Sequence, residues 1–414
     1  MNEKLSAKIP ANKMTMEDRG EQPNAMEPLV LSQGAPRRAE LTELAVNLTA
    51  AASGFRRSLP EGVISALADL VRSMNCYYSN LIEGHDTHPV DIERALKKDF
   101  SDDQTQRNLQ LEAAAHIKAQ KWIDEGGLHE HETTADSIKE THLQFCNELP
   151  EDLLWIEDPS SKERLRVIPG EYRERDVEVG HHMAVSPAAI PRFLARFEGA
   201  YCGLGVAETI LAAAAAHHRL LWIHPFLDGN GRVARLMSHA MLLRALNTGG
   251  VWSIARGLAR DVETYKRHLI ACDMRRRNDL DGRGNLSEEA LSEFTEFFLQ
   301  ICLDQVTYME DLAQPNKLRA RIQLWANEEI ATDSLPKQAV NLLDALLYRG
   351  EIPRGEVKDA LNVSDRSARR VISALANHEV VASNTPKGPL HIAFPARLAS
   401  RWMPGLFPEQ RGAD

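Results

Sequence analysis

The chain has 414 residues, of which 43% are hydrophobic, so we expect two or three folded domains with a sizeable core. Its formal net charge of −10 argues against a protein that coats nucleic acid, although a small local DNA-binding surface stays open. The sequence has no run of about twenty apolar residues, so we expect no membrane span.

The N-terminus and the cysteines indicate where the protein works. Residues 1–37 hold Pro, Glu and Met without a periodic apolar pattern, which predicts a flexible arm with no signal-peptide core. The cysteines are odd in number and show no metal-ligand spacing, which is typical of reduced thiols in the cytoplasm. They are Cys76, Cys146, Cys202, Cys272 and Cys302.

Residues 38–130 are predicted to be helical, and the clearest element is a helix at about 61–84. Its apolar residues recur at helical spacing, and Gly84 suits a helix C-terminus. Ser79 and Glu83 lie four residues apart, hence on one face of this helix. They form the pattern Ser-x-x-x-Glu-Gly, for which about 0.2 matches are expected by chance in a chain this long. An ordinary helix end with an exposed glutamate is therefore one interpretation.

Residues 131–312 are predicted as a helical core that short strands interrupt. Val, Ile and Tyr occur with Pro and Gly at residues 166–173, and a second β-rich stretch follows at 177–180. This composition indicates a β-hairpin on the surface.

The most informative segment reads His-Pro-Phe-Leu-Asp-Gly-Asn-Gly-Arg-Val-Ala-Arg at residues 224–235. A helix rich in Ala and Leu precedes it, and Pro225 would end that helix. Gly229 and Gly231 frame a flexible turn before a second helix. The segment is therefore a loop that leads into a helix N-terminus, where free N–H groups and a partial positive charge suit phosphate.

The side chains of this segment fit a site that handles a nucleotide. His224 is a candidate general base because its reference pKa lies near neutral pH. Asp228 offers a hard oxygen ligand for Mg²⁺. Arg232 and Arg235 share a helix face and can hold phosphate oxygens by charge-assisted hydrogen bonds. Phe226 is expected to anchor the loop in the core.

A helix–loop–helix with Asp228 as an N-cap and exposed arginines is the plainer interpretation, and for any single residue it is the better one. For the whole segment, however, this plainer interpretation explains the pattern poorly. Its specified positions would all match by chance with a probability on the order of a few in a hundred million. His217 and His218, in the middle of the preceding helix, are interpreted as structural.

Two segments after the motif are predicted to have structural roles. Residues 286–303 form an apolar pattern that predicts a helix closing the core. Residues 278–285 lack the spacing and terminal Glu of an EF-hand loop, so we expect a loop that connects helices.

The C-terminal part has a different character. Residues 313–334 are predicted as a linking helix, and 399–414 as a tail. Between them, 335–398 show the order of a helix-turn-helix followed by two short strands, which is the arrangement of a winged helix.

The predicted recognition helix of this module lies at residues 365–377, and Ser364 is a good N-cap for it. Residues 335–396 hold eight basic and six acidic side chains, a net charge of only +2. DNA binding and protein docking or dimerisation therefore both stay open. The arginines expected to meet bases or phosphates are Arg366, Arg369 and Arg370.

The segment 224–235 resembles the signature of Fic-domain proteins, His-x-Phe-x-(Asp/Glu)-Gly-Asn-Gly-Arg-x-x-Arg, with no departure at any signature position. The resemblance implies a mainly α-helical Fic-type bundle with a small β-hairpin flap, in the Fic/Doc superfamily. It also implies a protein adenylyltransferase: a target hydroxyl attacks the α-phosphate of ATP, AMP passes to the protein and pyrophosphate leaves. The related Doc branch has Lys where this chain has Gly231, and it phosphorylates, so Gly231 favours nucleotidyl transfer.

The resemblance implies a role for each residue of the motif. His224 would deprotonate the target hydroxyl, Asp228 would hold Mg²⁺, and Arg235 would hold the γ-phosphate. Tyr265 lies where relatives place a tyrosine near the adenine, and a core aromatic is the equally weighted alternative. The other expected phosphate contacts are Gly229, Asn230, Gly231 and Arg232.

The pattern at Ser79 and Glu83 resembles the inhibitory helix of Fic proteins, in the class that carries it before the core. The resemblance implies that Glu83 pairs with Arg235 and blocks productive placement of ATP. In some relatives this glutamate also supports removal of AMP. The predicted hairpin corresponds to a flap that aligns the main chain of the target by strand addition.

The implied partners are ATP and a protein with a hydroxyl side chain, with self-modification and a homodimer as further options. A Fic transferase that uses another nucleotide or a phosphocholine donor is one alternative. The second alternative is a DNA-binding transcriptional regulator whose Fic domain senses a nucleotide, since winged-helix modules often follow bacterial Fic domains.

Overall fold

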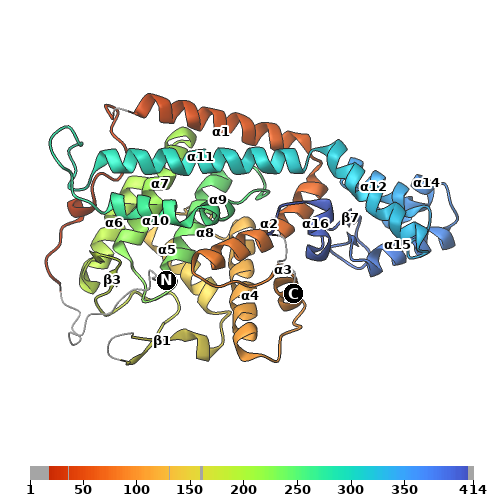
Figure 1. Cartoon of the computed structure of the whole chain (residues 1–414), viewed down its shortest axis with the longest axis horizontal. Helices are drawn as coiled ribbons and strands as arrows, with labels where there is room; N and C mark the ends of the chain where they lie inside the picture. The colour runs from red at the N-terminus through yellow and green to blue at the C-terminus, as the bar shows by residue number, and fades with distance from the viewer. Residues whose placement is uncertain (1–17, 36, 130, 159–161, 409–414) are drawn as a thin grey trace.

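The computed structural model describes residues 18–35, 37–129, 131–158 and 162–408, which form a mainly α-helical molecule, as predicted (Figure 1). The strands of these residues are short and belong to three small antiparallel sheets. One continuous hydrophobic core extends through the described chain from its N-terminal segment to its C-terminal segment.

The centre of the molecule is a pair of helices under a cover of two longer ones. α7 (Val206–Ile223) packs against α8 (Asn230–Leu246). The long helices α1 (Arg38–Ser58) and α11 (Glu288–Leu312) lie side by side along one edge and contact α7 (Figure 1). The loop between α7 and α8 is therefore held by an extensively buried framework.

α2 (Glu61–Ile82) contacts α4 and α9 and carries the predicted inhibitory pattern at its end. The other helices before α7 are α3 (Pro89–Leu96), α4 (Gln104–Asp124), α5 (Ala135–Cys146) and α6 (Ile190–Tyr201). After α8 come α9 (Ile254–Arg260) and α10 (Val262–Cys272). Short 3₁₀ helices lie at Pro23–Met26, Glu151–Leu154, Pro187–Ala189, Arg354–Glu356 and Ala396–Leu398.

Polar side chains fix where several helices begin. Asp103, Thr134 and Ser287 each accept a hydrogen bond from a main-chain N–H in the first turn of α4, α5 and α11. Such N-caps satisfy amides that have no partner inside the helix. α11 therefore begins at residue 288 rather than at 286 as predicted, and it runs on to residue 312.

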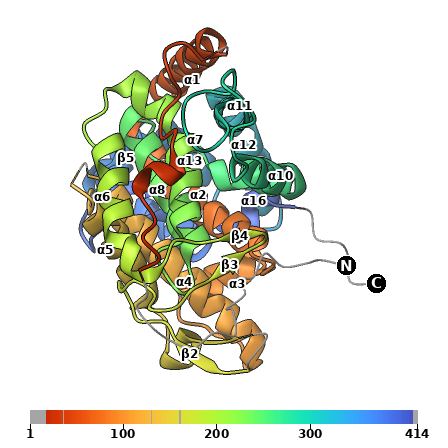
Figure 2. The same cartoon turned by 90° about the vertical axis from the view of Figure 1, so that its left-hand side faces the viewer.

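The strands near the motif form two hairpins rather than the single one predicted. β1 (Trp155–Glu157) pairs with β2 (Arg164–Arg166), and β3 (Glu178–Val179) pairs with β4 (His182–Met183). The β1–β2 hairpin lies on the side of the molecule opposite α1 (Figures 1 and 2). Residues 167–173 are not a strand, because their main chain bonds to other segments, including Arg173 N–H to Pro225 O at 2.9 Å.

The C-terminal unit, residues 315–408, combines helices with a three-stranded sheet in the order β5-β7-β6. Its third strand, β5, was not predicted, because two residues at a helix end carry no alternating pattern. Its elements are α12 (Pro315–Ala331), α13 (Ala339–Arg349), β5 (Glu351–Ile352), α14 (Val357–Leu361), α15 (Asp365–Asn377), β6 (Val381–Ala382), β7 (Leu390–Ile392) and α16 (Ala399–Trp402).

The segment before α1 differs from the flexible arm that we expected. Residues 18–31 lie against the helical core, with Met26 and Leu29 buried. The carbonyl oxygen of Leu29 accepts a hydrogen bond from Tyr201 Oη at 2.6 Å. Long-range contacts of this kind fix a segment whose sequence has no helix or strand period. The rest of the predicted arm, residues 1–17, lies outside the described residues.

The predicted tail at 399–414 also differs, as far as residue 408. Trp402 is 1% exposed and packs edge-on against Trp325 of α12, with ring centroids 5.2 Å apart. The carbonyl oxygen of Leu406 accepts from Tyr78 Oη of α2 at 3.1 Å. This part of the chain is therefore packed against α2 instead of extending from the last domain (Figure 1).

No helix in the described part of the chain is both long and apolar enough to cross a bilayer. The five cysteines are free, and four of them are buried. Burial raises the pKa of Cys146 and of Cys272 to about 12, so both thiols stay protonated at neutral pH.

Three histidines of the core are buried as neutral rings. Burial lowers the pKa of His116 and of His217 to about 3, and that of His142 to about 4. In the unfolded chain these rings have a pKa of about 6.5. Between these two pKa values the unfolded chain binds more protons than the folded chain. The contribution of the neutral rings to folding stability is therefore complete above about pH 6.5 and is lost on acidification.

We expect the free energy of unfolding to fall below about pH 6.5, by up to about 1.4 kcal/mol per pH unit for each histidine. Urea unfolding at a series of pH values measures the slope. His116→Leu should reduce the pH dependence of the unfolding free energy by one proton, because it removes one of the three titrating rings. Leucine suits this position because both nitrogens of His116 are buried without a hydrogen-bond partner in the described structure. The exposed His181 is the control, and His181→Leu should leave the slope unchanged. An unchanged slope in His116→Leu would contradict the assignment.

Candidate active site

The segment 224–235 forms the connection from α7 to α8. α7 ends because His224 adopts a left-handed conformation with φ 51°. α8 begins after Gly229, whose φ of 81° is accessible to glycine. Val233 N–H bonds back to Gly229 O at 3.0 Å. The three amides before it lie at the helix N-terminus without intrahelical partners, which is the arrangement that binds anions.

The loop between the helices is closed by Asn230. Its Oδ1 accepts from Phe226 N–H at 2.9 Å, and its Nδ2 donates to Phe226 O at 2.8 Å. Phe226 is buried as expected, and its ring stacks on His142 with centroids 3.9 Å apart. The side chain of Asn230 is therefore used within the loop, which leaves its main-chain N–H for the expected contact with phosphate.

His224 is in the state that a general base requires. Its Nδ1 lies 3.3 Å from Leu221 O. Because a carbonyl oxygen only accepts, Nδ1 carries the proton and Nε2 keeps its lone pair. Burial and then the charge of Arg173 lower the pKa of His224 to about 3. The ring is neutral at neutral pH and able to take a proton at Nε2.

Arg173 holds the backbone at His224, although no sequence pattern marks this residue. Its Nε donates to His224 O at 2.8 Å, and its Nη1 donates to Arg175 O at 2.7 Å. The side chain is buried, with 3% of the residue exposed. No local pattern announces this role, because the contact joins residues that are 51 positions apart.

Asp228 is the one exposed acidic residue of the loop. No group of three or more His, Cys, Asp or Glu is arranged to hold a metal ion within the ranges that the structure describes. A single carboxylate beside three free amides does not suit a metal that the protein alone must hold. It does fit Mg²⁺ that arrives with a phosphate, because Mg²⁺ commonly combines one or two carboxylates with substrate oxygens and water.

The predicted inhibitory residues lie at the C-terminus of α2. Gly84 ends the helix with φ 85°, and His85 N–H donates back to Asn80 O at 2.9 Å. This 6→1 hydrogen bond is the one found in a Schellman motif. Ser79 lies in the last turn and Glu83 caps the helix, so the two side chains share the face that meets α8.

The guanidinium of Arg235 is bound by this helix end. Its Nε donates to Ser79 Oγ at 2.8 Å, and its Nη2 donates to Glu83 Oε1 at 2.5 Å and to Ser79 O at 3.3 Å. Arg235 is 3% exposed, whereas the Glu83 side chain is 36% exposed. Glu83 and Arg235 thus meet as expected, and Ser79 adds contacts to Arg235 that the sequence pattern did not predict.

The Glu83 carboxylate also covers the start of α8. It lies so close to Gly231 that a side chain at that position would collide with it. Burial alone would raise the pKa of Glu83, but the charges of Arg235 and Arg232 outweigh burial and hold the pKa below its usual value. A charged carboxylate therefore lies where the helix terminus favours an anion.

The structure places Tyr265 in the core rather than on an open surface. Tyr265 is 2% exposed, and its Oη lies 2.6 Å from His217 Nε2. This position agrees with the core-aromatic alternative, and a contact with adenine stays a prediction. His217 also contacts Ser238 at 2.9 Å, and His218 contacts Asp273 at 3.0 Å, as structural residues do.

The β3–β4 hairpin is attached to the end of α7, beside the motif. His182 Nε2 lies 2.8 Å from Trp222 O, and the two rings stack with centroids 4.7 Å apart. Met183 of β4 is 44% exposed. This hairpin, rather than residues 166–173, is the candidate for the predicted flap.

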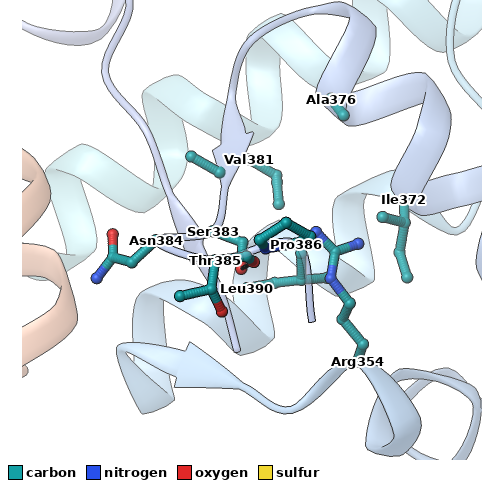
Figure 3. A pocket seen from close by; sticks show the side chains of 10 residues that line it. Arg354, Ile372, Ala376, Val381, Ser383, Asn384, Thr385, Pro386 and Leu390 are labelled. Carbon is teal, nitrogen blue, oxygen red and sulfur yellow. Dashed lines mark hydrogen bonds between the residues drawn. The ribbon is translucent and has the colours of Figure 1, made fainter. Parts of the chain in front are cut away.

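A separate groove of about 350 Å³ lies in the C-terminal unit, between α15 and the loop that follows β6 (Figure 3). None of the predicted site residues lines it. Its lining residues are Arg354, Ile372, Ala376, Val381, Ala382, Ser383, Asn384, Thr385, Pro386 and Leu390.

Comparison with known proteins identifies the domain that holds the motif. Residues 132–242 match the Fic/DOC family. The chain therefore carries a Fic domain, which contains the whole α7–α8 connection.

Individual relatives match over limited stretches. Protein adenylyltransferase Fic of Culex quinquefasciatus is 41% identical over 81 residues, which are 18% of this chain and 16% of that protein. The protein of the same name from Drosophila grimshawi is 28% identical over 171 residues, 41% of this chain and 32% of its own. The chain thus spans between about a sixth and a third of the length of these relatives.

Among solved structures, a Fic family protein from Desulfovibrio desulfuricans G20 aligns with 84% of this chain and 96% of its own. Its TM-score is 0.44 and its sequence identity is 16%.

Proposed function

We propose that this chain is an autoinhibited Fic enzyme that transfers AMP from ATP to a hydroxyl side chain of a protein. The observation that carries the proposal is a neutral His224, whose Nε2 has no hydrogen-bond partner among the described residues, in the loop that leads to the N-terminal amides of α8. The domain divisions belong to the same proposal, with a Fic core at 131–312 and a winged-helix domain at 335–398.

Each part of the loop has a role in the proposed reaction. The main-chain amides of residues 230–232 and the guanidinium of Arg232 bind phosphate oxygens of ATP. The target hydroxyl attacks the α-phosphorus, and its proton passes to His224 Nε2. The bond to the pyrophosphate oxygen breaks, so AMP stays on the target as a phosphodiester. Asp228 would hold Mg²⁺, which supplies positive charge to the phosphates when bound.

Two contacts support autoinhibition. The bonds of Arg235 to Ser79 and Glu83 keep this guanidinium away from a γ-phosphate. The Glu83 carboxylate in addition lies against Gly231, where phosphate oxygens would approach the amides. The Glu83 carboxylate and the phosphate oxygens are both negatively charged, and they would repel strongly at close approach in a partly buried site.

Intact-mass spectrometry of Glu83→Gly protein incubated with Mg²⁺ and candidate donors tests the proposed reaction. AMP transfer to the protein itself or to an added lysate protein adds the mass of an adenylyl group. A phosphoryl, uridylyl or phosphocholine mass would instead establish one of the other donor chemistries. No added mass with any donor, in protein that binds ATP, would favour a nucleotide sensor.

A second candidate function, DNA binding by the C-terminal unit, rests on α15. Ser364 caps this helix, as predicted, by accepting from Ser367 N–H. The arginines of the helix are exposed, and none of them takes part in an ion pair within the described structure. They are Arg366, Arg369 and Arg370.

We expect a gel shift with genomic DNA fragments at about 50 mM salt that weakens by more than tenfold at about 200 mM, because phosphate contacts release counterions. Replacing the three arginines of α15 with alanine should abolish it. Replacing Lys337 and Lys358, which lie in this unit outside α15, removes two positive charges and provides the control. No shift at low salt would contradict DNA binding and favour a docking role for the unit.

A further inference from the structure

The two arginines of the motif are each bound by a carboxylate, but in different ways. Arg235 is paired with Glu83 at the end of α2. Arg232 is paired with Glu112 of α4, whose Oε2 lies 2.9 Å from Arg232 Nη2. Glu112 belongs to neither the motif nor the inhibitory pattern, and nothing in the local sequence marks it.

The contacts of Arg232 fix its orientation without using up its donors. Its guanidinium lies over the Phe145 ring, 4.9 Å from the centroid. Nη2 donates to Glu112, whereas Nε is buried without a partner in the described residues. Arg235 differs, because its Nε and Nη2 are both bonded to the inhibitory helix end. An arginine has five N–H donors, and the two on Nη1 of Arg232 have no partner in the described structure, so they stay available for a phosphate.

Glu112 is itself held in place. The same Oε2 lies 2.9 Å from His85 Nδ1, and the carboxylate is mostly buried. Burial would raise the pKa of Glu112, but the hydrogen bond from His85 and then the charge of Arg232 outweigh it, so the pKa lies below its usual value. The carboxylate is charged at neutral pH and has a single orientation.

We propose that Glu112 is a positioning residue that presents Arg232 to the phosphates of the nucleotide, in contrast to Glu83, which withholds Arg235. The proposal rests on the proposed function, because it assumes that this site binds a nucleotide. A guanidinium already held between Phe145 and Glu112 loses little side-chain entropy when it binds phosphate. Without Glu112, the Arg232 side chain would have to become ordered when the nucleotide binds.

The test measures the affinity for Mg²⁺–ATP by calorimetry, in a Glu83→Gly, His224→Ala background that opens the site and prevents turnover. Adding Glu112→Ala should weaken ATP binding by about tenfold, or about 1.4 kcal/mol, which lies within the cost of ordering an arginine side chain on binding. Glu112→Gln retains the shape and an acceptor oxygen, so an intermediate affinity is expected. Glu125→Ala, at the exposed C-terminal end of the same helix, is the control and should change the affinity by less than about twofold.

The outcomes separate the alternatives. Unchanged ATP affinity in folded Glu112→Ala would show that Glu112 is only structural, and tighter binding would make it a second inhibitory carboxylate. Should the alanine variant fail to fold, the affinity of Glu112→Gln decides in the same way. AMP transfer is measured separately in Glu83→Gly protein with intact His224. If Glu83→Gly protein binds ATP but transfers no AMP, the proposed reaction is contradicted. The ATP affinities of the Glu112 variants would still test the role of Glu112.

Discussion

Replacing Glu83 with glycine is expected to raise AMP transfer by about 10–100-fold. The change removes the carboxylate that pairs with Arg235 Nη2 and lies against Gly231. Arg235 then becomes available to the γ-phosphate, and a negative charge leaves the approach to the N-terminus of α8. A contact between two sites typically couples them by about 1–3 kcal/mol, which sets the expected range. The measurement is the initial rate of label incorporation from ATP labelled in the α-phosphate.

The chain offers a matched control for this substitution. Glu125 also caps a helix and precedes a glycine, but it is exposed and pairs with Lys121, far from the motif in sequence. Glu125→Gly should therefore leave the rate at the wild-type value. Ser79→Ala should give a smaller increase than Glu83→Gly, since it removes one hydrogen bond to Arg235 and no charge. Equal rates in Glu83→Gly and wild type would refute autoinhibition by this residue.

Much of this arrangement could be predicted, because its parts carry local patterns. α2 has the apolar spacing of a helix and a terminal glycine, and the α7–α8 connection has its breakers and its glycines. The pairing of Glu83 with Arg235 spans 152 residues, and spacing alone did not imply it. It was expected only because both patterns resemble parts of one family.

The residues that were missed act across long distances and from segments without periodicity. Arg173 reaches His224, and Glu112 reaches Arg232 over 120 residues. A buried charged side chain in a polar stretch looks like any surface residue in sequence. The packed segment at 18–31 shows the same difficulty, since its contacts come from helices that follow much later.

The hairpins illustrate a competition that sequence patterns do not reveal. Residues 167–173 have the composition of a strand, yet Gly170 N–H donates to His142 Nδ1 at 2.9 Å and Arg173 N–H donates to Pro225 O at 2.9 Å. Main-chain groups that bond to the site framework are no longer available to a strand partner. Residues 167–173 therefore stabilise the motif through main-chain hydrogen bonds, and β3–β4 is the hairpin that lies beside it.

Replacing His224 with alanine in the Glu83→Gly background is expected to lower AMP transfer by about 10²–10⁴-fold, which is the usual contribution of a general base. The loss should fall on kcat, because the ring is neutral and its one hydrogen bond within the described structure is to Leu221 O. His224→Asn is the better-matched variant, since asparagine tolerates the left-handed backbone at this position and cannot take the proton.

The pH profile distinguishes a base from a residue that only supports the loop. Because the pKa of His224 is lowered to about 3, the base form persists on acidification, and the rate of Glu83→Gly should change little between about pH 8 and pH 6. An ordinary histidine, with a pKa near 6.5, would lose most of its base form over that range. His224→Asn that binds Mg²⁺–ATP normally but transfers no AMP would support the assignment. Weakened ATP binding with proportionate transfer would instead assign His224 to the loop framework, because a proton acceptor for the target hydroxyl has no reason to contribute to nucleotide affinity.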